Sequence, residues 1–223
     1  MPVLELTIDS SYVPTWNTFN AIRELVQNAK DADTLGHKME IVYNKNRTEP
    51  TLKLINKGGY LNKSSLLLGG TTKRGKENQI GCWGEGLKLA WLTLLRSGHK
   101  IWARFQNETW VPEISYSETY KSDILKVKVT KSQTVENDLV VEVRGLAESD
   151  WLAIKERFLF EPFVCLGESE KIELGGSKIL LSEKYRNQLF VKGIWVCELP
   201  SKYFFGYDLS GVNLDRDRSL VNP

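Results

Sequence analysis

The chain is poor in the two residue types that most often build metal sites and disulfides. Its 223 residues include only three cysteines and two histidines. Cys82, Cys165 and Cys197 lie far apart, and no CxxC or Cys/His cluster occurs, so no structural zinc site is indicated. An odd cysteine count without framework spacing is typical of a protein in a reducing compartment. His37 and His99 have no recognisable partners in the sequence.

Long apolar runs and an excess of one charge are missing too. The longest apolar stretch, near LKLAWLTLL, is far shorter than a membrane span. The N-terminal MPVLELTIDS lacks the basic start and apolar run of a signal peptide. A net charge of +2 makes no general case for a polyanionic partner. We therefore expect a cytoplasmic protein that does not contact a membrane and does not bind nucleic acid directly.

The hydrophobic pattern that is present predicts an α+β protein. Helical spacing predicts helices at about 16–31, 84–97 and 147–160, with one short helix around 64–68. Alternation predicts strands at 3–8, 38–44, 51–56, 100–106, 124–130, 138–145, 178–182, 187–193 and 194–199, the last two as a hairpin around Lys192–Gly193. Together these elements predict a mixed, mostly antiparallel sheet with helices on one face.

The first predicted helix carries the stretch ELVQNAKDAD, in which three polar residues share one stripe. Glu24, Asn28 and Asp31 are spaced i, i+4 and i+7 and so fall on one face. The opposite face is apolar and consists of Phe19, Ile22, Leu25, Val26 and Ala29. The stripe has two interpretations: an ordinary solvated face of an amphipathic helix, or a site where acid and amide jointly hold a metal ion and a water. The helix alone does not decide between them.

A glycine pattern opens the second predicted helix. IGCWGEGLKLA places Gly81, Gly84 and Gly86 before free helix N–H groups, which favour an anion such as a phosphate. A tight loop without a ligand explains the same glycines equally well. The segment does not directly follow a strand and lacks the GK[ST] ending of a P-loop.

A third feature is the strand end LKLINKGGY. Leu52, Leu54 and Asn56 alternate, so Asn56 is predicted to face the same side as the apolar pair. An amide facing inward there can pair with the edge of a nucleobase. The alternative is an ordinary turn rich in Asn and Gly.

In this order the three fragments resemble the GHKL superfamily of ATP-binding domains. This superfamily holds type II topoisomerase ATPases, ninety-kilodalton heat-shock chaperones, sensor histidine kinases and MutL proteins. The resemblance covers roughly residues 15–145. It implies a Bergerat fold, which is a two-layer α/β sandwich with a long ATP lid between the second and third fragments. It also implies ATP and Mg²⁺ as ligands.

The resemblance implies a role for individual residues. Glu24 corresponds to the general base that orients the attacking water, and Asn28 corresponds to the magnesium ligand. Asp31 takes a supporting role, and Gly58 sits where the nucleobase approaches closely. The remaining nucleotide-binding residues implied are the lid residues Thr71, Thr72, Lys73 and Arg74, and the phosphate-binding residues Gly81, Gly84, Glu85, Gly86, Leu87 and Lys88. For Lys88 the alternative is a solvent-facing charge.

The chain departs from the family at Asn56, where relatives usually carry an aspartate. Asparagine can accept from adenine, but it can also donate to the oxygen of guanine, so base preference stays open. Sensor kinases usually carry an asparagine where Glu24 stands here, so ATP hydrolysis is favoured over phosphotransfer. Near the C-terminus, NLDRDRS is either a locally compensated turn or a segment that sends Arg216 or Arg218 to a nucleotide or a partner subunit.

We therefore expect a nucleotide-binding core at 1–145 and, at 146–223, an extension of a helix and strands packed on the same domain. The leading hypothesis is a nucleotide-driven conformational switch with slow ATP hydrolysis, whose partner is a second copy or another protein. The alternative is a non-catalytic nucleotide-sensing or protein-interaction module. A weaker third idea, nucleic-acid binding through KRGK and the tryptophans, conflicts with the nearly balanced charge.

Overall fold

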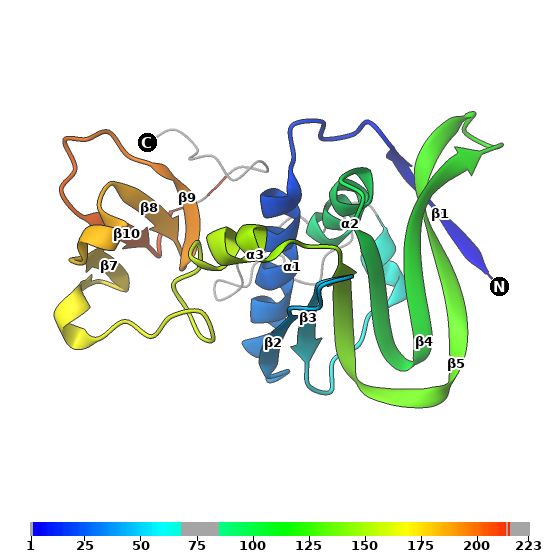
Figure 1. Ribbon diagram of the computed structural model, residues 1–223, viewed down its shortest axis with the longest axis horizontal. Helices are drawn as coiled ribbons and strands as arrows, with labels where there is room; N and C mark the ends of the chain where they lie inside the picture. The colour runs from blue at the N-terminus through cyan, green and yellow to red at the C-terminus, as the bar shows by residue number, and fades with distance from the viewer. Residues whose placement is uncertain (1, 68–84, 213, 215–223) are drawn as a thin grey trace. The chain divides into compact units, whose positions relative to one another are not determined.

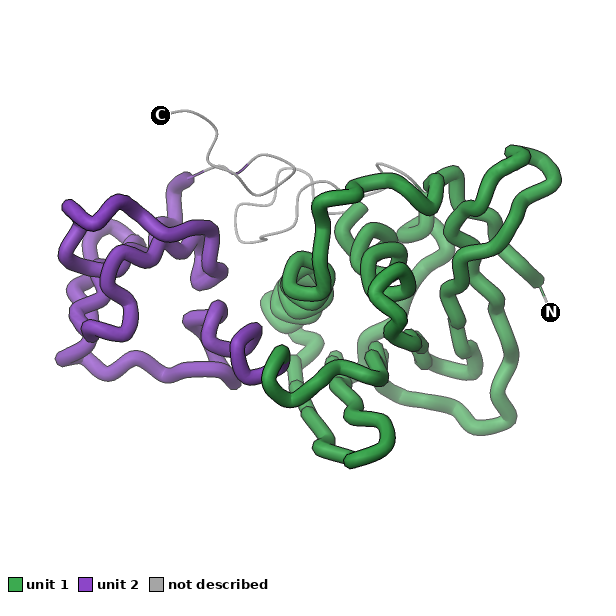
Figure 2. Tube along the Cα trace, turned by 45° about the horizontal axis from the view of Figure 1, so that its top comes forward, with its two compact units in different colours: residues 1–150 green, residues 151–223 purple. Residues whose placement is uncertain are grey.

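The chain forms two compact units in the computed structural model, which describes residues 2–67, 85–212 and 214 (Figure 1). Unit 1 comprises Met1–Asp150 and unit 2 comprises Trp151–Pro223 (Figure 2). Both units are mixed α/β, and both contain a sheet in which most strands pair antiparallel. None of the described helices is long and apolar enough to cross a membrane.

The sheet of unit 1 is built around one long strand. Its order is β1 (Val3–Asp9), β5 (Ser122–Arg144), β3 (Thr51–Asn56) and β2 (Met39–Asn44), and β4 (Lys100–Ser117) also pairs with β5. All of these pairings are antiparallel. The start of β5 pairs with β1 and its end with β3, while β4 follows β5 along most of its length. Strand β5 therefore holds the other strands of the sheet together.

Three strand predictions need correction. The predicted strands at 124–130 and 138–145 are one continuous strand, β5, and the predicted strand at 100–106 continues to Ser117 as β4. The intervening polar stretch KSQTVEND resembles a turn by composition, but it lies within the long β4–β5 ribbon and is mostly exposed. A two-stranded ribbon needs no apolar face along its whole length. The hydrophobic alternation that predicts strands is therefore absent from this stretch.

Two helices pack against one face of this sheet. Helix α1 (Thr18–Asp33) begins with a capping box in which Asn17 and Asn20 each accept a hydrogen bond from the other's backbone N–H. Helix α2 (Gly86–Arg96) contacts α1 and β4. The predicted helices at 16–31 and 84–97 are confirmed with shifted ends, and the predicted short helix is the 3₁₀ turn η1 (Lys63–Leu66).

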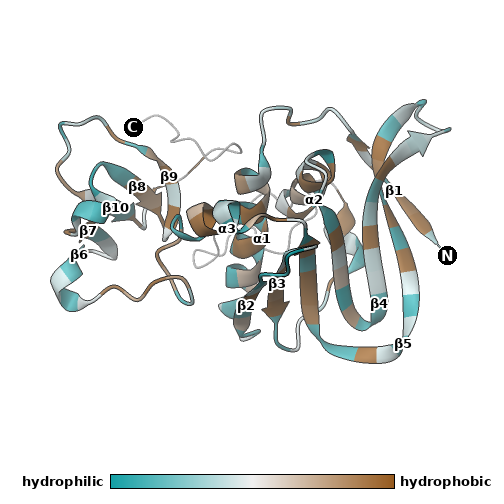
Figure 3. Ribbon diagram, viewed as in Figure 1, coloured by the Kyte–Doolittle hydropathy of each residue, from teal (hydrophilic) through white to brown (hydrophobic). Residues whose placement is uncertain are grey.

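Where β3, β5 and β4 pair at the centre of the unit 1 sheet, their side chains alternate between two faces. Leu52, Leu54 and Val143 are buried beneath the helices. The opposite face carries Lys53, Trp102, Arg104, Glu142 and Arg144, and we call it the polar face. In register, Lys53 and Trp102 lie on either side of Glu142 on neighbouring strands. Figure 3 shows the alternation as hydrophobic and hydrophilic segments along β4 and β5.

Unit 2 is a small sheet with its own core. Helix α3 (Glu148–Lys155) spans the unit boundary, and the strand order is β6 (Lys171–Leu174), β7 (Ser177–Leu180), β10 (Gly206–Leu209), β8 (Gln188–Val191) and β9 (Ile194–Glu198). Only the β10–β8 pairing is parallel among these strands. Two further 3₁₀ turns are η2 (Glu168–Glu170) and η3 (Glu183–Tyr185). The core cluster consists of Leu159, Leu180, Tyr185 and Phe190.

Predictions for unit 2 are partly confirmed. The hairpin at Lys192–Gly193 is present, and both residues have positive φ, 51° and 76°, as a tight two-residue turn requires. The third helix ends at Lys155 rather than at 160, because Phe158 leaves it to pair with Ile194 and stack on Phe163. Strands β6 and β10 were not predicted from the sequence; each is only four residues long.

Candidate functional site

The polar stripe of α1 lies in the interior of unit 1 rather than in solvent. Glu24 is 4% exposed and Asp31 is fully buried, while Asn28 between them is half-buried. The interpretation of the stripe as an ordinary solvated face is therefore wrong. Burying a carboxylate costs free energy unless the group is paired or hydrogen-bonded, so this arrangement needs a structural or functional reason.

Glu24 lies directly against the start of α2. A Cβ atom placed on Gly86 would lie 3.3 Å from the Glu24 Cδ and would overlap Oε2, so any larger residue here would require the carboxylate to move. Glu85, the N-cap of α2, makes no side-chain capping hydrogen bond, and the first turn contains no acidic residue. The positive end of the α2 dipole therefore faces the carboxylate of another helix. Arg23 adds a long contact, with its Nη2 3.4 Å from Oε1 of Glu24.

Asn56 is buried on the helix side of the sheet, as the alternation predicts. Its Nδ2 donates hydrogen bonds to the carbonyl oxygens of Ala29 in α1 and His37, each at 2.9 Å. These two acceptors fix the orientation of the amide, because only the NH2 group can face two carbonyls. Oδ1 receives no hydrogen bond from any residue within 2–67, 85–212 and 214. Among the described residues, Oδ1 is thus the side-chain atom of Asn56 that makes no hydrogen bond.

The two glycines after β3, Gly58 and Gly59, lie in different environments. Gly58 is exposed with φ +64°, and its N–H donates to Asp138 Oδ1 at 3.0 Å. This backbone hydrogen bond, with that from Lys57, holds the pKa of Asp138 below its usual value. Gly59 is buried, and a Cβ there would lie 3.1 Å from Asn56 and 3.2 Å from Leu139. Gly59, which sequence reasoning missed, is the glycine that packs against the candidate base-binding residue; the Gly-Gly pair was its only signal.

Lys88 is fully buried in the first turn of α2. Its ammonium donates to the backbone carbonyls of Ser65 at 2.9 Å and Leu67 at 2.8 Å, so the alternative of a solvent-facing charge is wrong. Burial lowers its pKa to about 8, although the charge of Glu85 acts in the opposite direction. Lys88 therefore ties the start of α2 to η1 and to the residue directly after it.

The described residues are compatible with a magnesium site only if a bound nucleotide supplies most of the ligands. No group of three or more His, Cys, Asp or Glu side chains in the described ranges is arranged to hold a metal ion. Magnesium bound with nucleotides takes most of its ligands from phosphate and water and needs only one or two protein oxygens. The amide of Asn28, half-buried one helical turn beyond Glu24, fits that requirement.

The other predicted site residues are distributed as follows. Glu85 and Leu87 flank Gly86 at the start of α2, and both are half-buried. The predictions for Thr71, Thr72, Lys73, Arg74, Gly81, Gly84, Arg216 and Arg218 fall on residues outside those that the structure describes. The described structure thus brings together Glu24, Gly86 and the start of α2, and it places Asn56 on the same side of the sheet, bonded to α1.

No protein-family model matches the sequence, and no curated protein matches it. Function is therefore inferred from the sequence motifs and from the contacts of the described residues.

Proposed function

We propose that unit 1 is a Mg²⁺-dependent ATP-binding domain of the Bergerat type that hydrolyses ATP slowly and acts as a nucleotide-driven switch. Two helices on one face of an antiparallel sheet are compatible with that fold. The motifs on α1, at the end of β3 and at the start of α2 are those in which the chain resembles the GHKL superfamily. A cytoplasmic location, and a second copy or a protein partner that senses the nucleotide, belong to the same proposal.

The observation that carries the proposal is the contact between Glu24 and Gly86. A triphosphate bound at the start of α2 would meet the backbone N–H groups of the first helical turn and the positive end of the helix dipole. Glu24 would then lie beside the terminal phosphate, where its carboxylate can accept a proton from a water. The water oxygen bonds to the γ-phosphorus, the bond to the bridging oxygen breaks, and ADP and phosphate leave. Magnesium held by Asn28 would neutralise phosphate charge.

The hydrogen bonds of Asn56 favour adenine over guanine. Both protons of its NH2 group are directed to the carbonyls of Ala29 and His37, so Oδ1 is the atom left to contact a base. A carbonyl oxygen accepts from the exocyclic amine of adenine but repels the exocyclic oxygen of guanine at the same place. Asn56 therefore acts as an acceptor, as an aspartate would.

A specific observation favours the second candidate function, a nucleotide-sensing or protein-interaction module without catalysis. Two predicted ligand-binding groups, the Lys88 ammonium and the Asn56 NH2 group, are engaged by backbone carbonyls. If the whole pocket serves such structural contacts, the domain would bind nucleotide without turnover or not at all.

Calorimetry with ATP, GTP and a non-hydrolysable ATP analogue, with and without Mg²⁺, tests the proposal together with a phosphate-release assay. We expect ATP to bind more tightly than GTP, and binding to need Mg²⁺. Glu24→Gln should retain ATP binding and lose about a hundredfold in turnover. Asn28→Ala should lose the Mg²⁺-dependent part of the affinity.

Glu118→Gln is the matched control, because it removes a carboxylate that is 84% exposed in the turn between β4 and β5. It should bind and hydrolyse ATP like the parent. Parent-like turnover by Glu24→Gln would show that the assigned base is wrong. ATP binding without turnover by the parent would select the non-catalytic alternative, and no binding of any nucleotide would reject both functions.

A further inference from the structure

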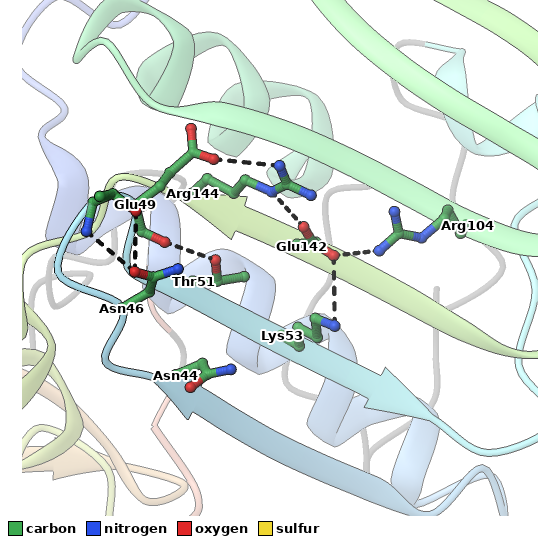
Figure 4. A pocket seen from close by; sticks show the side chains of 9 residues that line it. Asn44, Asn46, Glu49, Thr51, Lys53, Arg104, Glu142 and Arg144 are labelled. Carbon is green, nitrogen blue, oxygen red and sulfur yellow. Dashed lines mark hydrogen bonds and ion pairs between the residues drawn. The ribbon is translucent and has the colours of Figure 1, made fainter.

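The polar face of the unit 1 sheet contains a cavity that no part of the proposed ATPase uses. Its volume is about 420 Å³ (Figure 4). Residues of β2, β3, β4, β5 and the loop between β2 and β3 line it. At its base lies Glu142, which is only 2% exposed. Since Glu142 lies between Val141 and Val143 of the helix side, the cavity opens on the face opposite the candidate nucleotide site.

Glu142 organises three cations around one carboxylate. Arg104 donates from Nη2 to Oε2, Arg144 donates from Nε to Oε1 at 2.6 Å, and the Lys53 ammonium lies 3.8 Å from Oε2. Burial alone would raise the pKa of Glu142, but the hydrogen bonds from Arg144 and Arg104 outweigh it and lower the pKa. The carboxylate is therefore ionised, and it fixes the positions of the cations.

The cluster nevertheless has more positive than negative charges. Glu49 is the second carboxylate, and it accepts from Lys100 at 2.8 Å and from Arg144 at 3.3 Å. Four cations, Lys53, Lys100, Arg104 and Arg144, thus share two carboxylates. A network that served only to stabilise the sheet would be expected to balance its charges, because unpaired like charges repel one another.

Two of these cations retain donors that can reach a ligand. Arg144 is held on three sides, by both carboxylates and by the Trp102 ring 4.5 Å below its guanidinium carbon. Arg104 and Lys53 are less constrained: each contacts only Oε2 of Glu142 in the part of the chain that the structure describes, and their side chains are 33% and 42% exposed. Both cations therefore meet at Oε2 of Glu142, and the Nε and Nη1 groups of Arg104 and the Lys53 ammonium keep donors for a ligand.

We propose that this cavity is a second binding site, which takes the phosphate monoester group of a small polar metabolite. Arg104 and Lys53 donate to the phosphate oxygens. Glu142 fixes these two cations next to each other, so that both can bind oxygens of the same anion. The neutral rim of Asn46, Thr48 and Thr51 offers hydroxyl and amide groups to the rest of the ligand, as hydroxyl-rich phosphate esters require. The site is independent of ATP hydrolysis.

NMR titration of the full chain tests this site through the arginine Nε–H signals. The probes are inorganic phosphate, ribose 5-phosphate and a short oligothymidylate, each at constant ionic strength balanced with chloride. We expect the Arg104 and Arg144 signals to shift and saturate with ribose 5-phosphate. Arg104→Gln should weaken that binding about tenfold, while ATP turnover stays at the parent level. Lys121→Gln, which removes an exposed lysine from the turn after β4, should bind like the parent.

Shifts that grow linearly without saturation would overturn the proposal, as would parent-like binding by Arg104→Gln. If inorganic phosphate binds as tightly as ribose 5-phosphate, the ligand is the free phosphate anion, and the proposal of a phosphorylated metabolite is wrong. Binding of the oligothymidylate alone would make the polar face a nucleic-acid surface instead. Should Arg104→Gln fail to fold, Lys53→Gln gives the same comparison, because Lys53 is more exposed and contacts Glu142 at a longer distance.

Discussion

The two faces of the unit 1 sheet are made by the same strands, yet they bury polar groups in different ways. On the helix side, Asn56 and Lys88 direct their donors to backbone carbonyls. On the polar face, Glu142 is surrounded by charged side chains. Backbone acceptors are fixed by the fold, whereas side chains can change partners. The helix side is therefore suited to hold a rigid pocket, and the polar face to exchange an internal ion pair for a ligand.

The largest effect is expected from breaking the polar face at its centre. Glu142→Ala would leave Arg104 and Arg144 without their shared carboxylate, and should lower the free energy of unfolding by about 3 kcal/mol. Because the arginines are partly exposed, this loss of unfolding free energy lies at the lower end of the range for removing one partner of a buried ion pair. Urea denaturation measures it. The control Glu113→Ala, which removes a partly exposed partner of Lys128, should cost less than about 1 kcal/mol. Equal losses would contradict the central role of Glu142.

On the helix side, restoring the aspartate usual in the resembled family should destabilise the protein. Asn56→Asp replaces the NH2 group by an oxygen that faces the carbonyls of Ala29 and His37, and should cost about 2 kcal/mol of unfolding free energy. Thermal unfolding measures the change. Asn62→Asp, at an exposed position that makes no capping bond, is the matched control and should be neutral. A stable Asn56→Asp variant would show that the two carbonyl contacts do not hold the amide.

A methyl group at Gly86 tests the approach of α1 to α2. Gly86→Ala would push the Glu24 carboxylate away from the start of α2, and we expect about tenfold slower ATP turnover, equivalent to ~1.4 kcal/mol. Alanine favours a helix over glycine, so loss of helix does not explain the effect. Steady-state phosphate release measures it. Gly211→Ala, where an added Cβ meets nothing within 4 Å, should leave turnover unchanged. Parent-like turnover of Gly86→Ala would place Glu24 outside the chemistry.

The last comparison is a pH dependence that distinguishes a buried from an exposed lysine. The folded pKa of Lys88, about 8, lies below its unfolded value, so the unfolded chain binds more protons between the two values. The parent should therefore gain stability relative to Lys88→Met as pH rises from 8 to 10. Lys57 has a raised pKa because of Asp138, so the comparison with Lys57→Met should show the opposite slope at high pH. Chemical denaturation at several pH values measures both.

Patterns local to one element predicted most of the fold and part of the site. Alternation identified β1, β2 and β3 and the side to which Asn56 points, and helical spacing identified α1 and α2. The features that were not predicted depend on residues distant in the sequence. The burial of Glu24 depends on α2, and the polar stretch inside β5 is extended because β4 pairs beside it.

The cluster on the polar face could not have been predicted from the sequence. Lys53, Trp102 and Glu142 become neighbours only through the register of three strands. In the sequence, each of these residues is an ordinary charged or aromatic residue of a strand. Lys88 shows the same limit in a helix, because its partners, Ser65 and Leu67, lie in a separate segment.

Strand β5 also determines when unit 1 can form during synthesis. Residues of β1 pair with residues about 120 positions later in the chain, and β3 waits for the far end of the same strand. Strands β2 and β3 can pair with each other as soon as both have emerged, but β1 and the other edge of β3 have no partner until β5 follows. A sheet dominated by such distant pairings folds slowly and exposes aggregation-prone edges in the meantime. Nascent chains halted before β5 should therefore depend on chaperones, whereas chains released after it should not.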